Sequence, residues 1–90
     1  MPDAVQIFVQ PTPNPNALKF TLNRTVSPSA KTYTAASPTA DSPLAQALLG
    51  IPNVQQVFFL NDFVTVTRTP EGSWDAIVPL AEAALREHLQ

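Results

Sequence analysis

Two segments near the start of the chain alternate apolar and polar residues, and a proline-rich connector separates them. Residues 4–10 and 17–22 both place apolar side chains at every second position, which is the period of a β-strand with one buried face. The connector, residues 11–16, holds three prolines, each of which lacks an N–H donor and fixes φ at about −65°. Because this connector cannot continue a hydrogen-bonded strand, the sequence predicts a β-hairpin with a stiff, wide loop.

Residues 25–43 have a different composition, since fifteen of these nineteen residues are Ser, Thr, Pro or Ala. This composition is typical of a loop, although a structureless loop of this length is uncommon inside a compact domain. Within the segment, residues 31–35 are predicted to form a short strand at a sheet edge.

A short helix is predicted after this segment. Ser42 suits the N-cap position, and Pro43 suits the first helical position, where the missing N–H costs nothing. Gly50, followed by Pro52, signals the end of the helix about two turns later.

A second hairpin is predicted from residues 54–60 and 63–68, which flank the turn at residues 61–62. The run 57–60 is apolar on both faces. Such a run indicates a central strand covered on both sides, or a strand with one face covered by a partner. Phe58, which lies in this run, is expected in the core.

The last predicted element is an amphipathic helix that starts near Ser73 or Asp75 and contains Pro79. Its apolar residues follow helical spacing, with Leu85 expected in the core. Trp74 is expected to pack the start of the helix against the sheet rather than to stack on a ligand. The order β-β-(loop)-α-β-β-α predicts a single small α+β domain, in which two helices pack on one sheet.

Composition excludes several kinds of function. The chain has no cysteine and one histidine, so it lacks a thiolate ligand for a metal or cluster, and His88 alone cannot form a metal site. The acidic residues are spread thinly, and neither glycine lies in a phosphate-binding motif. We therefore expect no enzyme activity, no catalytic residue, no metal site and no cofactor.

Charge and hydropathy limit the kinds of partner that this chain is expected to bind. The net charge is −2, and the five Lys and Arg residues are scattered along the chain, so we expect no nucleic-acid partner. No apolar run approaches the roughly 18 residues of a membrane span, so we expect no membrane partner. The absence of a signal sequence and of cysteine fits a cytoplasmic protein.

Several short motifs occur in order along nearly the whole chain. They are TPNPNALKF at 12–20, SPLA at 42–45, GIPNV at 50–54, VF at 57–58, NDFVTVT at 61–67, Trp74, and a helix containing Pro79. This pattern resembles the N-terminal domain of Nfu/NifU-type iron–sulfur cluster scaffold proteins. Residues 1–90 are identified as one such domain, with residues 25–43 as its Ser/Thr/Pro/Ala-rich loop.

The resemblance implies a specific role. In two-domain members of this family, a C-terminal domain with a CxxC motif binds the cluster, and the N-terminal domain assists contacts with other proteins. The resemblance therefore implies a stand-alone, non-catalytic accessory module for protein interaction in iron–sulfur cluster assembly or delivery, without cluster ligands of its own. The implied partners are iron–sulfur assembly proteins or client apoproteins, with a CxxC-containing Nfu-type protein as one candidate.

The candidate residues for partner binding are Thr12, Pro13, Asn14, Pro15, Asn16, Lys19, Asp62 and Phe63. A proline-rich loop is rigid and loses little entropy on docking, and the Asn and Lys side chains add hydrogen-bonding groups and a charge. The same loop fits a structural role, because Asn beside Pro commonly caps turns. Phe63 is either an exposed aromatic anchor or the first residue of a strand after a turn.

Two other functions fit the sequence. An iron carrier would use carboxylate ligands such as Asp62, Glu71 and Asp75, although nothing in the sequence shows that these residues converge. A purely structural subunit would bind a partner through the apolar strand 57–60 as a sheet edge.

Overall fold

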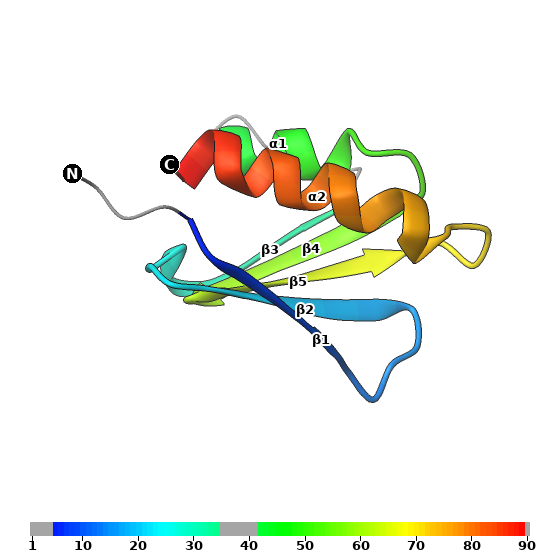
Figure 1. Cartoon of the computed structure of the whole chain (residues 1–90), viewed down its shortest axis with the longest axis horizontal. Helices are drawn as coiled ribbons and strands as arrows, with labels where there is room; N and C mark the ends of the chain where they lie inside the picture. Colours follow the sequence, from blue (N-terminus) through cyan, green and yellow to red (C-terminus); the bar gives the residue numbers. More distant parts are fainter. Residues whose placement is uncertain (1–4, 35–41, 90) are drawn as a thin grey trace.

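The computed structural model describes residues 5–34 and 42–89, which form an α+β domain (Figure 1). Its five-stranded antiparallel sheet has the order β1-β2-β5-β4-β3, and both helices lie on one face of this sheet. The elements are β1 (Ile7–Pro11), β2 (Ala17–Leu22), β3 (Ser27–Thr34), α1 (Pro43–Leu49), β4 (Val54–Asn61), β5 (Phe63–Arg68) and α2 (Trp74–Leu89).

The observed order β-β-β-α-β-β-α confirms the predicted α+β class and adds one full strand. β3 begins at Ser27, within the segment that the sequence predicts mostly as a loop, and it is the edge strand beside β4. Only Ser27 and Tyr33 of its eight residues are buried, so an edge strand of this kind forms without an apolar alternation. Residue 35, the last of the predicted strand 31–35, lies outside the described residues.

β4 lies between β5 and β3, so the apolar run 57–60 belongs to an internal strand. The alternative in which this run binds a partner as a sheet edge is therefore wrong. The prediction of a central strand is confirmed, but the helices cover only one of its two faces.

The predicted start of α1 is confirmed. The Ser42 side chain accepts a hydrogen bond from the Ala45 N–H at 3.1 Å, and Pro43 occupies the first turn. The Gly50 N–H donates to the Gln46 carbonyl at 3.0 Å and closes the last turn.

α2 begins at Trp74, and the carbonyl of Ser73 accepts the N–H of Ile77 at 3.0 Å. Of the two predicted starting points, the structure therefore selects Ser73. Pro79 consequently lies inside the helix and is exposed, and its ring nitrogen cannot donate to the Asp75 carbonyl one turn earlier. Neither helix of the described chain is both long and apolar enough to cross a membrane.

The core lies between the helices and one sheet face. Its most deeply buried large side chains are Val5, Phe20, Leu48, Val57, Val64, Val66, Ile77 and Leu85. Leu85 is thus in the core as predicted, whereas the core prediction for Phe58 is wrong. Phe58 is only half-buried and lies on the opposite face from its neighbours Val57 and Phe59. A run that is apolar at every position gives no alternation from which to choose the buried face.

Replacing Leu85 by Ala should lower the free energy of unfolding by about 2–5 kcal/mol, because it leaves a cavity in a fully buried site. Phe58→Ala should cost roughly 1 kcal/mol, because part of this ring already contacts solvent. Urea denaturation of both variants measures the difference. Equal losses would contradict the assignment of Phe58 to the open face.

Candidate functional site

The face of the sheet opposite the helices is not covered by any described element (Figure 1). By strand register and ring contacts, this face carries an aromatic cluster. Strand register aligns its members across the sheet, because Thr21 pairs with both Phe8 and Phe63, and Phe63 pairs with Leu60. In the next row, Thr65 pairs with both Lys19 and Phe58. We call Phe8, Lys19, Phe58, Leu60 and Phe63 the open-face patch.

Two of the predicted partner-binding residues meet at the centre of this patch. The Lys19 Nζ lies 4.5 Å from the centroid of the Phe63 ring, within the range of a cation–π interaction. The Phe58 ring lies beside Phe63, with centroids 6.1 Å apart and planes tilted by 46°. These contacts fix the orientation of the Phe63 ring and hold one positive charge over an apolar surface.

The surroundings of the open-face patch are polar but uncharged. Within the described strands, Lys19 is the only charged residue that faces this way, and the remaining side chains around the patch include Gln10, Thr21, Thr32, Gln56, Thr65 and Thr67. Depletion of charge, enrichment in aromatic rings and a polar rim are features of protein–protein interfaces. The face therefore has the chemistry of a protein-binding surface.

The proline-rich loop between β1 and β2 is held by its own side chains. The Thr12 hydroxyl accepts the Asn14 N–H at 3.1 Å and lies 2.9 Å from the carbonyl oxygens of Asn14 and Ala17. The Asn14 Oδ1 accepts the Asn16 N–H at 2.9 Å. These bonds are the turn-capping role expected of Asn beside Pro, and they pre-form the loop.

The loop is also fixed from outside by the connection between β5 and α2. The Trp74 indole N–H donates to the Pro15 carbonyl at 3.3 Å, and the Arg68 guanidinium lies 5.5 Å from the centroid of the indole ring. The Arg68 N–H donates to the Asn16 carbonyl at 2.8 Å, and its guanidinium donates to the Gly72 carbonyl. Trp74 packs against the core as predicted and additionally supports the loop.

The predicted residues thus fall into three places. Residues 12–16 form the loop that precedes β2, beside the last residues of β5. Lys19 and Phe63 lie on the open face. Asp62 lies in the turn that precedes β5, at the opposite end of the same strand pair. The Asp62 carbonyl accepts the Leu22 N–H at 2.7 Å, and its side chain is exposed. Asp62 and the loop therefore cannot contact the same small group on a partner.

The carboxylates of the alternative iron-carrier function do not converge. Asp62 precedes β5, whereas Glu71 and Asp75 follow it, and a six-residue strand spans about 20 Å. Among the described residues, no three His, Asp or Glu side chains are grouped so that they could hold a metal ion. These three acids therefore do not form one iron site.

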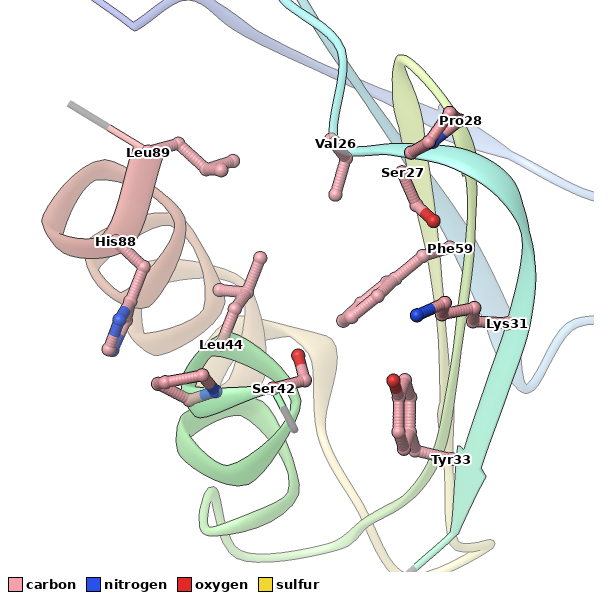
Figure 2. A pocket seen from close by; sticks show the side chains of 11 residues that line it. Val26, Ser27, Pro28, Lys31, Tyr33, Ser42, Leu44, Phe59, His88 and Leu89 are labelled. Atoms are coloured by element: carbon pink, nitrogen blue, oxygen red, sulfur yellow. The ribbon is translucent and has the colours of Figure 1, made fainter. Parts of the chain in front are cut away.

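A cavity of about 330 Å³ lies on the helix side of the sheet, between β3 and the ends of both helices (Figure 2). The Lys31 amine and the Tyr33 hydroxyl point into it, and Leu44 and Phe59 form apolar walls. His88 lies at its rim. None of the predicted partner-binding residues lines this cavity, and residues so far apart in the sequence leave no local motif that could have revealed it.

The open-sheet α+β architecture has known counterparts. Residues 6–90 match the family model described as "Scaffold protein Nfu/NifU N terminal". The chain therefore belongs to the Nfu/NifU N-terminal domain family. It has no cysteine, so it carries no CxxC motif.

The chain resembles named iron–sulfur scaffold proteins over part of their length. It is 39% identical over 83 residues to the mitochondrial NFU1 iron-sulfur cluster scaffold homolog of Drosophila grimshawi, with 90% of this chain and 28% of the relative aligned. A NifU-like protein of Schizosaccharomyces pombe is 34% identical over 89 residues, with 96% of this chain and 34% of the relative aligned. The chain thus spans about a third or less of these relatives. Because some relatives are named as mitochondrial proteins, the cytoplasmic location stays a prediction.

Solved structures show the same fold. The solution structure of a NifU-like protein from Saccharomyces cerevisiae matches with a TM-score of 0.85 and 26% identity over 96% of this chain and 79% of that one. The crystal structure of Staphylococcus aureus protein SAV1430 matches with a TM-score of 0.77 and 25% identity over 92% of this chain and 99% of that one.

Thr12→Val should lower the free energy of unfolding by roughly 1–2 kcal/mol, because it removes the hydroxyl that joins both ends of the loop. Asn16→Ala is the matched control. Within the described residues the Asn16 side chain makes no hydrogen bond, so this change should stay within about 0.5 kcal/mol. Thermal and urea unfolding of both variants measure the difference, and a neutral Thr12→Val would show that the loop is held by other contacts.

Proposed function

We propose that this chain is a non-catalytic accessory module that binds proteins of iron–sulfur cluster assembly or delivery. The observation that supports this proposal most directly is the open-face patch, an aromatic surface with one lysine at its centre and uncharged polar surroundings. Family membership supports the link to iron–sulfur clusters, because the matched relatives are named as cluster scaffold proteins. The chain has no cysteine, so a cluster near it would take its thiolate ligands from the partner.

The chemistry of the patch specifies the surface that would bind it. Phe58 and Phe63 favour an apolar or aromatic contact, and their burial supplies most of the binding energy. The Lys19 amine favours a carboxylate of the partner beside that contact, since a lysine desolvated without a counter-charge would weaken binding. The partner surface is therefore apolar with one acidic side chain near its centre.

The loop at residues 12–16 is proposed as a second, smaller contact. Its backbone is pre-formed by Thr12 and Asn14, so docking costs little conformational entropy. The exposed Pro13 and Pro15 rings and the side chain of Asn16 remain available to a partner. Asp62 and the loop lie at opposite ends of the sheet, and a partner that contacts both would have to span the open face.

Binding of the purified chain to a purified CxxC-containing Nfu-type protein from the same organism, and to an iron–sulfur client apoprotein, tests this function. Lys19→Glu should weaken binding to the recognised partner at least tenfold, because it replaces attraction to a carboxylate by repulsion. Lys31→Glu is the control, since it makes the same charge change at the cavity on the helix side. It should change affinity less than threefold. Calorimetry under anaerobic, reducing conditions measures both.

The double variant Asn14→Ala with Asn16→Ala separates the loop from the patch. If it weakens binding while the fold is retained, the loop contacts the partner, and if affinity is unchanged, the loop serves the fold alone. Equal effects of Lys19→Glu and Lys31→Glu would contradict the open-face patch as the binding surface. Absence of binding by the unmodified chain to both classes of protein would contradict the proposed function itself.

A further inference from the structure

β1 is an edge strand whose first four residues lack the proline, the charges and the irregular register that normally prevent edge-to-edge pairing. Its five residues include no charged side chain, and no described segment pairs with its outer side. Phe8 is 57% exposed and Val9 is 39% exposed, on opposite faces of the strand. An exposed apolar edge with free backbone groups is a template for another strand.

The opposite edge of the sheet is protected. β3 contains Pro28, which cannot donate a backbone hydrogen bond, and the charged Lys31. Its register with β4 shifts between Ser27 and Lys31, so the edge is irregular. Proline, lysine and irregular register are the usual protections of edge strands, and their absence from most of β1 singles this strand out.

The hydrogen bonds that β2 makes to β5 determine which backbone N–H and C=O groups of β1 point away from the sheet. The Leu22 N–H donates to Asp62 at 2.7 Å, and the Asn16 carbonyl accepts from Arg68 at 2.8 Å, so the even-numbered residues of β2 direct their backbone groups toward β5. Its odd-numbered residues, which include Lys19 and Thr21, therefore direct their backbone groups toward β1.

Thr21 and Lys19 face Phe8 and Gln10, which are the hydrogen-bonded partners in β1. The backbone groups of Ile7, Val9 and Pro11 consequently point outward. Pro11, which has no N–H, thus stands at a position where no bond to β2 is lost. The free edge offers complete donor and acceptor pairs at Ile7 and Val9.

We propose that β1 pairs in antiparallel fashion with β1 of a second copy of this chain, about a two-fold axis at Phe8. In this register Ile7 lies opposite Val9 of the second copy, and Val9 lies opposite Ile7 of the second copy. Each pair exchanges two backbone hydrogen bonds, so all four outward donors and acceptors of the two residues are satisfied. Phe8 stands opposite Phe8 of the second copy at a non-hydrogen-bonded position, where Cβ atoms are about 4.5–5.5 Å apart.

Pro11 favours the register centred on Phe8 over the register centred on Val9. Pairing centred on Val9 would place Pro11 opposite Ile7 of the second copy, and the Ile7 carbonyl would face a residue without an N–H. Pairing centred on Phe8 places Pro11 opposite Val5 of the second copy, whose carbonyl already accepts a hydrogen bond from the Arg86 guanidinium at 2.6 Å. It also buries the most exposed large apolar side chain of the described chain. A second copy is the favoured occupant because the strand is uncharged and self-complementary, so the two-fold arrangement brings no like charges together.

The dimer should be weak. One short strand per copy buries less surface than the roughly 1,200–2,000 Å² of a standard interface, so we expect dissociation in the range of about 10 μM to 1 mM. Sedimentation equilibrium of the full chain from 10 μM to 1 mM measures it. A strictly monomeric chain at 1 mM would overturn the proposal.

Phe8→Lys should raise the dissociation constant at least tenfold, because it places two like charges opposite each other at the axis. Thr32→Lys is the matched control, since it makes the same charge change at an exposed position on the other edge strand. Its dimer should match that of the unmodified chain. Undiminished association of folded Phe8→Lys, or equal loss in both variants, would overturn pairing through β1.

Cross-linking tests the register independently. The chain has no cysteine, so a single introduced thiol can form a disulfide only between copies. With copper–phenanthroline and oxygen as the oxidant, Phe8→Cys should cross-link at least tenfold faster than Thr32→Cys or Gln10→Cys, because position 8 meets its own symmetry mate. Equal rates for the three variants, or fastest cross-linking of Val9→Cys, would overturn the Phe8-centred register.

Discussion

Burial of a single sheet face is the constraint on which the rest of the structure depends. Leu48, Ile77 and Leu85 of the helices pack against Phe20, Val57, Val64 and Val66 of the sheet, and all are almost completely buried. Each such side chain contributes about 1.5–3 kcal/mol when it leaves water. Two helices of seven and sixteen residues supply this cover on one side only. The opposite sheet face is therefore left to solvent or to a partner, and it carries aromatic rings as well as threonines.

The central pairing of β2 with β5 explains why functional candidates from both hairpins lie together. This pairing joins the two hairpins, which are separated in sequence by β3 and α1. It brings Lys19 over Phe63, and it brings the proline-rich loop against Trp74 and Arg68. The patch and the loop are thus products of one strand pairing, and a change that weakens that pairing would disturb both.

Local signals predict most of the fold. Alternation predicts the first hairpin and β5, and the apolar run 57–60 predicts β4. The Ser42, Pro43 and Gly50 signals predict α1, because strand period, capping and helix termination depend on neighbouring residues. β3 is predicted only in part, as an edge strand at 31–35, because an edge strand buries few side chains and its Ser/Thr/Pro/Ala composition is also that of a loop. The buried face of the run 57–60 cannot be chosen because every position is apolar.

The candidate site is predictable only in part. The sequence identifies Lys19 and Phe63 separately, but their contact depends on non-local strand pairing, which no local pattern encodes. The cavity at Lys31 and Tyr33 is missed entirely for the same reason, since it needs the ends of both helices beside β3. Phe8 is assigned to a strand, yet its exposure follows only from the position of β1 at the end of the sheet order.

Phe8 belongs both to the open-face patch and to the unprotected edge, and this links the two proposed interactions. Antiparallel pairing about Phe8 would join two five-stranded sheets into one and place their open faces on the same side, because strand pairing preserves the face of each pleat. Two Lys19–Phe63 pairs would then be presented together. A partner that is itself two-fold symmetric would bind both Lys19–Phe63 pairs at once. The weak dimer would then raise the apparent affinity for that partner without any new contact, even where each patch alone binds weakly.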